Sequence, residues 1–185
     1  MPIPCPTVKN GSHTLGPDNG TLQVKTYRAG MAQKAGHDLV IDVTSWKGTV
    51  EVDDSSNFTV ELSADPRSLR VRDGQGGMKP LTDKDRTDIH KNIDDKVLKG
   101  QAITFRSTGV SSNGSGPASV TGDVTMGGNT RPVSLDVEVM PDGQVRGAVR
   151  LAQSEWGIKP YSGLMGALKV RDDVEVLLHA QLPAA

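Results

Sequence analysis

Apolar and polar residues alternate along most of the chain with a period of two. In the clearest run, Phe58, Val60 and Leu62 alternate with polar residues. The same pattern recurs in the segments 21–29, 37–44, 103–107, 120–126, 133–139, 145–151 and 174–182. Such alternation is typical of antiparallel strands that have one face in the core and the other in water. The pattern therefore predicts an all-β, antiparallel protein.

Turn-forming residues separate neighbouring segments. Pro141, Asp142 and Gly143 stand between two of the runs, where proline presets φ and glycine accepts a positive φ. Gly127 and Gly128 separate two other runs in the same way. Short turns between consecutive strands indicate a meander. About eight strands of this kind close into a barrel whose interior can hold a small apolar ligand.

One segment departs from the two-residue period. Between residues 82 and 98, apolar residues recur at every fourth position from Ile89 to Val97, which predicts an amphipathic helix. Thr82 and Asp85 have the spacing of a capping box, with aspartate in the usual place of glutamate. We expect this helical insertion to pack across the sheet or to cover an open end.

The two ends of the pattern define the domain. The first 20 residues have no periodicity and contain Pro2, Pro4 and Pro6 together with several glycines. Because proline cannot donate to a sheet and glycine resists fixing, we expect a flexible N-terminal arm over residues 1–20. A length of 185 residues suits a single domain, which we place at residues 21–183.

Composition and charge exclude several classes of protein. The 21 basic and 22 acidic residues give a net charge of −1, which argues against a nucleic-acid binder. No apolar run approaches the roughly 18 residues of a membrane span, so we expect no stable membrane insertion. Cys5 is the single cysteine, which excludes a disulfide within the chain. No signal peptide is visible, and we expect a cytoplasmic protein; a periplasmic or secreted location stays open if an export segment was trimmed.

Candidate catalytic and metal-binding residues are sparse. His37 and Asp38 are adjacent, so on a strand they point to opposite faces and cannot form one catalytic pair. His90 and Asp94 share a helix face, but a zinc site needs three or four ligands. The chain has no G-x-S-x-G nucleophile motif. We therefore expect no catalytic residue, no metal site and no cofactor.

Four short stretches carry a family resemblance through their order and spacing. They are residues 35–39 (AGHDL), 97–107 with the run ITFRS, 122–133 (GDVTMGGNTRPV) and 156–159 (WGIK). Together with the helical segment between them, they resemble the YceI-like family of lipocalin-like, isoprenoid-binding bacterial proteins over about residues 20–182. The resemblance implies an extended antiparallel barrel with a long apolar interior that takes up a polyisoprenoid or a similar amphiphilic lipid.

Under this resemblance, the protein carries or sequesters a lipid without a covalent bond. The candidate ligand-binding residues are Leu39, Ile41, Val43, Phe58, Val60, Leu62, Phe105, Val124, Leu135, Val137, Val149, Trp156 and Val176. Each buried methylene would contribute about 0.8 kcal/mol. The nearly apolar inward faces argue against an enzyme. The alternative is a partner-binding or structural barrel with a filled core and no ligand, because periodicity does not distinguish a hollow interior from a filled one.

Two further segments leave alternatives open. Arg67 and Arg70 belong either to a solvated loop or, with His37, to a polar rim that meets an anionic head group. The loop from Trp156 to Leu168 is unusually apolar, so it either folds onto the core or edges an opening. An apolar loop at a barrel end is also compatible with a homodimer.

Overall fold

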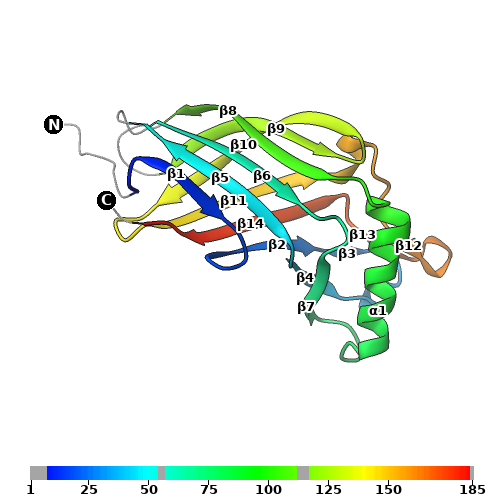
Figure 1. Ribbon diagram of the computed structural model, residues 1–185. Helices are drawn as coiled ribbons and strands as arrows, with labels where there is room; N and C mark the ends of the chain where they lie inside the picture. Colours follow the sequence, from blue (N-terminus) through cyan, green and yellow to red (C-terminus); the bar gives the residue numbers. More distant parts are fainter. Residues whose placement is uncertain (1–7, 54–56, 112–116, 184–185) are drawn as a thin grey trace.

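A curled antiparallel sheet with an α-helix at one end dominates the computed structural model, which describes residues 8–53, 57–111 and 117–183 (Figure 1). The strands are β1 (Gly11–Leu15), β2 (Gly20–Thr26), β3 (Arg28–Ala29), β4 (Asp38–Val43), β5 (Trp46–Val52), β6 (Phe58–Ala64), β7 (Leu69–Gln75), β8 (Ile103–Ser111), β9 (Ala118–Met126), β10 (Asn129–Val139), β11 (Gln144–Ala152), β12 (Ser162–Gly163), β13 (Leu168–Val170) and β14 (Asp173–Gln181). The predicted all-β, antiparallel, barrel-like fold with a helical insertion is confirmed.

Eleven strands form the main sheet in the order β1-β5-β6-β8-β9-β10-β11-β14-β2-β4-β7, and β12-β13-β3 form a small second sheet. Consecutive strands β4 and β5 therefore lie near opposite ends of the order. β4 and β5 form one arm of a long hairpin, and β6 and β7 form the other. Both arms bend at a corner, where the Thr44 N–H donates to Ser68 O (2.9 Å) and the Asp65 N–H donates to Ser45 O (2.9 Å). This bent hairpin curls the sheet around its apolar face.

The strand count is higher than the expected eight because three strands of the main sheet were not predicted. In β5, buried Trp46 and Val50 alternate with exposed Lys47 and Thr49, so the period-two signal was present there. In β7, Arg70 lies in a segment that the sequence analysis treated as a loop or rim. The basic side chain is exposed there because it occupies the outer face of an edge strand, where charge is favourable.

The third unpredicted strand, β1, corrects the expected N-terminal arm. Gly11 to Leu15 pair antiparallel with β5, and the Leu15 side chain is only 2 % exposed. The Lys9 N–H also donates to Pro183 O (3.2 Å), which joins this segment to the other end of the chain. Pairing and burial here outweigh the low strand preference of glycine. Residues 1–7, including Cys5 and the three prolines, lie outside the described residues.

The helical insertion consists of α1 (Asp83–Asn92) followed by a π-helical turn, η2 (Ile93–Leu98). The predicted capping box is present: Thr82 Oγ1 accepts the Asp85 N–H (3.1 Å), and Asp85 Oδ2 accepts the Thr82 N–H (2.9 Å). Arg86 ties α1 to β7 by donating from Nη1 to Val71 O (2.8 Å). In the described part of the chain, no helix has the length and apolar character needed to span a membrane.

Short 3₁₀ turns complete the described elements and shape the α1 end of the molecule. They are η1 (Gln33–Ala35), η3 (Gln153–Trp156) and η4 (Leu164–Gly166). Beside α1 the core is packed solidly, because Trp156, Ile41 and Leu98 are 1 %, 3 % and 7 % exposed. The helical insertion therefore lies at the end where the sheet's interior is filled.

Candidate functional site

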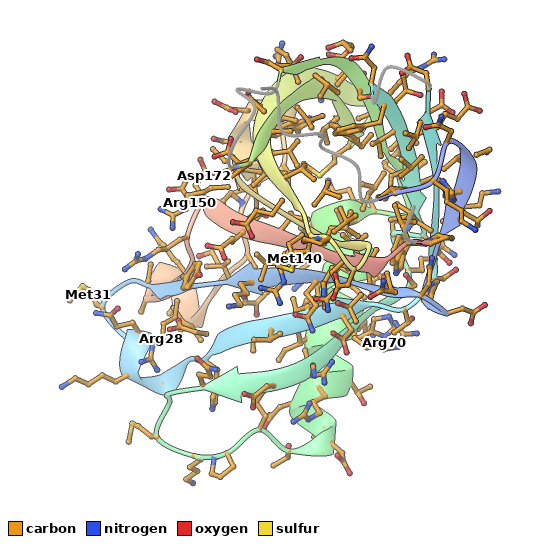
Figure 2. All side chains as sticks on the ribbon, turned by 90° about the vertical axis from the view of Figure 1, so that its left-hand side faces the viewer. Arg28, Met31, Arg70, Met140, Arg150 and Asp172 are labelled. Atoms are coloured by element: carbon orange, nitrogen blue, oxygen red, sulfur yellow. The ribbon has the colours of Figure 1, made fainter. Side chains whose placement is uncertain are left out.

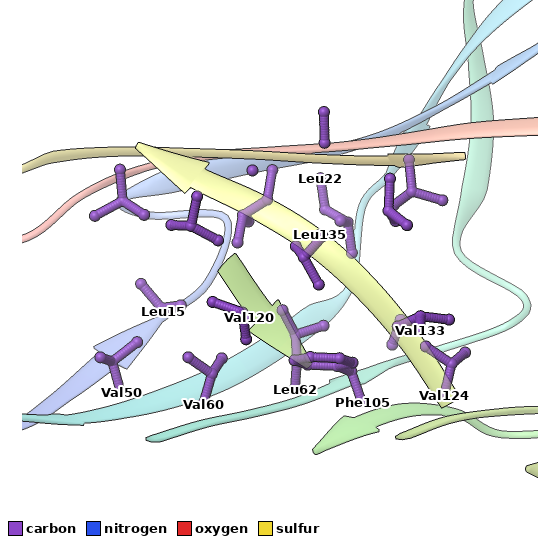
Figure 3. A pocket seen from close by; sticks show the side chains of 18 of the residues that line it. Leu15, Leu22, Val50, Val60, Leu62, Phe105, Val120, Val124, Val133 and Leu135 are labelled. Atoms are coloured by element: carbon purple, nitrogen blue, oxygen red, sulfur yellow. The ribbon is translucent and has the colours of Figure 1, made fainter. Parts of the chain in front are cut away.

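The curled sheet encloses an apolar cavity of about 250 Å³. Its walls are the inner faces of β1, β2, β5, β6, β8 to β11 and β14, and Figure 3 shows Leu15, Phe105 and Leu135 among the side chains that surround it. Of the described residues that line it, only Thr104 carries a hydroxyl, amide or charged side-chain group. The cavity therefore offers a ligand almost nothing except aliphatic and aromatic surface.

Several short side chains leave room in the cavity. Val60, Val137 and Val149 point inward but remain half-buried, since they face the hollow rather than a packed neighbour. Gly147 contributes no side chain at all, and it lies opposite Val137 in the β10–β11 ladder. A Cβ atom at Gly147 would lie 3.5 Å from Leu135 Cδ1, which is an ordinary contact distance. The wall therefore has spare room at this point.

The cavity is long and narrow. On β10 its lining residues run from Val133 to Val139, six residue steps that correspond to about 20 Å of strand. At one end it is lined by Val8 and Leu182, and towards α1 it is lined by Leu69. A volume of about 250 Å³ spread over that length suits a single chain better than a bulky ring system.

Trp156 closes the packed core beyond the cavity at the α1 end. Its indole Nε1–H donates to Val124 O (2.9 Å), and its carbonyl accepts the Asn129 side-chain amide (2.8 Å). Ile158 beside it is also buried. The loop that begins at Trp156 therefore folds onto the core at this point and does not edge the interior cavity.

Most of the predicted ligand-binding residues line this cavity. They are Val43, Phe58, Val60, Leu62, Phe105, Val124, Leu135, Val137, Val149 and Val176. Three predicted residues do not: Ile41 and Trp156 belong to the packed core, and Leu39 lines a different hollow.

Several lining residues were missed by the sequence analysis. Val8 and Leu15 fell in the expected arm, whereas Val50 lies in the unpredicted strand β5. The alternation of β5 was the signal that could have found Val50. For Val8 no sequence signal exists, because its place in the cavity depends on the contact between the two ends of the chain.

The second hollow is a cleft of about 510 Å³ between α1, the small sheet and the segment 76–81. Its lining is mixed, with Leu39, Ile89 and Leu168 beside several charged groups. His37 lies here, with Nε2 2.6 Å from Lys79 O. His37 thus anchors a loop of the cleft.

The three residues expected to form a polar rim are not brought together at the interior cavity. His37 lines the cleft, whereas Arg67 and Arg70 contact the ring of His90. His90 Nε2 lies 3.2 Å from Arg67 O and also meets Arg70 Nη1. None of these residues lines the interior cavity.

Two groups on α1, next to the cleft, have pKa values that differ from their ordinary ones. Hydrogen bonds from the Thr82 N–H and hydroxyl hold the pKa of Asp85 below its ordinary value. The Asp88 carboxylate, 2.8 Å away, raises the pKa of Lys84 through a hydrogen bond and charge attraction. Neither group lines the interior cavity.

Among the residues that the structure describes, no group of three or more histidine, cysteine or acidic side chains is arranged to hold a metal ion. His90 and Asp94 do approach each other on the helix, with Nε2 and Oδ2 3.4 Å apart. Two ligands fall short of a structural zinc site.

Comparison with known proteins gives a family and a fold. The model of the YceI-like domain matches residues 14–182. The chain is similar in structure to Burkholderia cenocepacia BcnA, with a TM-score of 0.64 at 16 % identity over 86 % of this chain and 94 % of that one. A mutant Campylobacter jejuni YCEI protein, crystallised with monobromobimane as guest, gives a TM-score of 0.55 at 13 % identity over 78 % of this chain and 84 % of that one.

No curated protein sequence matches the chain. At such low identities the two structures support the fold alone, whereas the domain model covers nearly the whole sequence. The chain belongs to the family of YceI-like domains.

Proposed function

We propose that the protein binds one long-chain isoprenoid, or a similar amphiphilic lipid, in the interior cavity and carries or sequesters it without a covalent bond. The observation that supports this function is the long, nearly uncharged hollow of about 250 Å³. For scale, an engineered apolar cavity of about 150 Å³ in another protein stays dry and binds benzene.

The lining sets the chemical class of the ligand. Removal of methylenes from water contributes about 0.8 kcal/mol each. Because Thr104 is the one hydroxyl-bearing residue in the lining, a charged head group would be desolvated there without a partner. The apolar chain therefore occupies the cavity, and a polar end of the ligand stays outside it.

Native mass spectrometry of gently purified protein tests whether a lipid is present. A bound mass that disappears on denaturation, and that matches a prenyl or acyl lipid, is the expected result. Protein at the apo mass, combined with no uptake of an added fluorescent prenyl probe, would contradict lipid binding. It would instead favour a partner-binding barrel without a ligand.

A cavity-blocking variant tests where the probe binds. Gly147→Leu places a side chain between Leu135 and Val137 in the hollow. We expect at least about a tenfold loss of probe affinity with little change in stability, because ligand and side chain compete for one space.

The matched control is Arg146→Leu on the same strand, because the Arg146 side chain is exposed and does not line the cavity. The control should bind the probe like the natural protein. Equal binding by a folded Gly147→Leu protein would mean that the probe is held outside this cavity.

A further inference from the structure

Three exposed methionines mark the α1 end of the molecule. Met31, Met78 and Met165 are 98 %, 78 % and 100 % exposed, whereas the other large hydrophobic side chains of the described residues are at least partly covered. Figure 2 shows Met31 projecting away from the barrel. Single exposed apolar residues are ordinary on protein surfaces. Three exposed, flexible methionine side chains on adjoining loops are unusual.

Main-chain contacts hold the loops of Met31 and Met165 together. Strands β3 and β13 pair with each other, and the Ala32 N–H donates to Ala167 O (2.8 Å). The loop of Met78 borders the same cleft as β13, because Met78 and Leu168 both line it. The three methionines therefore belong to one face.

This face also has an unusual charge. The segments 28–36, 76–81 and 157–171 contain six of the chain's 21 basic residues and none of its 22 acidic ones. We call these three segments the methionine–lysine face. Its basic residues are Arg28, Lys34, Lys79, Lys159, Lys169 and Arg171. A local excess of positive charge on a chain with net charge −1 points to an anionic partner.

Three of the basic side chains of the face are available to such a partner, whereas Arg28 pairs with Asp38. Lys34, Lys79 and Lys169 are exposed, and they take no part in the ion pairs found among the described residues. Three carboxylates next to the face are already engaged: Asp38 lies 3.7 Å from Arg28, Asp85 accepts hydrogen bonds from Thr82, and Asp88 binds Lys84 at 2.8 Å.

We propose that the methionine–lysine face docks on the surface of a lipid bilayer that contains anionic phospholipid. Flexible apolar side chains on separate loops can enter the boundary between head groups and acyl chains, while lysines around them reach the phosphates. A protein partner usually meets a continuous, well-packed apolar centre, whereas separate projecting tips suit a fluid surface. This docking is peripheral, and it inserts no part of the sheet into the bilayer.

Docking is independent of the proposed lipid binding. The face lies at the end where Trp156 and Leu98 fill the interior, whereas Val8 and Leu182 line the cavity at the other end (Figure 1). Protein with an empty cavity should therefore bind vesicles as well as protein with an occupied one. Gly147→Leu, which blocks the cavity, should leave docking unchanged.

Vesicle flotation tests the proposal directly. The full chain should float with phosphatidylcholine vesicles that contain phosphatidylglycerol and stay behind with phosphatidylcholine alone. Added salt should release it, because lysine attraction to a charged surface is screened. Equal flotation with both vesicles, or none with either, would overturn the proposal.

Charge reversal identifies the face. The variant K34E/K169E should weaken vesicle binding by at least about 30-fold, since each basic residue at an anionic surface strengthens binding about fivefold. The control K9E/K47E changes the net charge equally at exposed positions outside the face and should bind nearly as the natural protein does. Equal loss in both variants would mean that net charge alone drives binding, and the proposal would fail.

The methionines give a second, uncharged test. The variant M31S/M78S/M165S keeps every charge and should lose at least about tenfold in vesicle affinity, because three apolar side chains no longer leave water. Circular dichroism and Tm should match the natural protein, as all three side chains are exposed. If this variant instead converts a dimer to a monomer in sedimentation while vesicle binding is unchanged, the face is a contact between two copies and the proposal is wrong.

Discussion

The two hollows of this molecule have opposite construction. The interior cavity of about 250 Å³ is walled by strands, and among the described residues that line it Thr104 alone has a polar side chain. The cleft of about 510 Å³ is larger, but loops and a helix form it, and Arg28, His37 and Asp85 stand among its lining residues. The larger hollow is thus the more polar one, so size and apolar character point to different places in the molecule.

Two polar side chains of the cleft, Arg28 and His37, are bound by the protein itself. Arg28 donates to Gly36 O (3.0 Å) and lies 3.7 Å from the Asp38 carboxylate, while His37 bonds to Lys79 O. These contacts hold the cleft's loops in place. The interior cavity has no such internal partners for its lining, because apolar side chains make no directional bonds. The cavity therefore offers apolar surface that is free of internal bonds, whereas the polar groups named in the cleft anchor its loops.

The largest expected effect comes from a charge in the cavity. Val60→Asp puts a carboxylate on the inner face of β6, where burial without a partner costs several kcal/mol. The protein should unfold at much lower urea, or fold with the aspartate protonated and fail to take up the prenyl probe. Urea titration and probe fluorescence measure both outcomes.

Ser63→Asp is the control on the same strand, because Ser63 lies on the outer face opposite Lys47. It should keep both stability and uptake. A folded Val60→Asp protein that binds the probe normally would contradict binding in the interior cavity. The ligand would then have to lie in the cleft.

The regular part of the fold was predictable because its physics is local. Residues 57–65 were predicted as a strand, and β6 spans Phe58–Ala64. Alternation with a period of two indicates which face of a strand is buried. Apolar residues spaced four apart, together with a capping box, indicate a helix. β1 was not predictable in this way, because Leu15 is buried by strands far along the chain and not by its neighbours in sequence.

The site was predictable in kind but not in extent, as β4 illustrates. Leu39, Ile41 and Val43 alternate regularly, so one face was expected to line one tunnel. In the structure Val43 lines the cavity, Ile41 is packed in the core and Leu39 faces the cleft. Alternation identifies the face of a strand, but not how far the strand runs past the end of the hollow. A register shift between Val40 and Ile41 adds to the divergence.

A smaller effect is expected at the helix that borders the cleft. Thr82→Ala removes the hydroxyl of the capping box and should lower Tm by about 2–4 °C in a chain of this size. The pKa of Asp85 should rise only part of the way towards its ordinary 3.8, because the hydroxyl's hydrogen bond is lost while that of the backbone N–H, which lowers the pKa most, remains. NMR titration measures that change.

The sign of the pH dependence follows from that depressed pKa. The bond between Asp85 and Thr82 stabilises the fold above the ordinary pKa of Asp85 and is lost as the pH falls through the lowered one. Thr82→Ala should therefore flatten the stability curve in acid. Probe uptake should not change, and a fall in uptake would show that the two hollows are coupled.

The smallest effect should come from His37→Ala. This side chain anchors the segment 76–81 through Lys79 O, at 2.6 Å, and lies outside the interior cavity. We expect probe affinity within about twofold of the natural value and a loss of stability of about 1 kcal/mol, the typical worth of one hydrogen bond. Isothermal titration and urea unfolding measure the two quantities. Loss of uptake in a folded His37→Ala protein would place the polar end of the ligand in the cleft, so that one ligand would span both hollows.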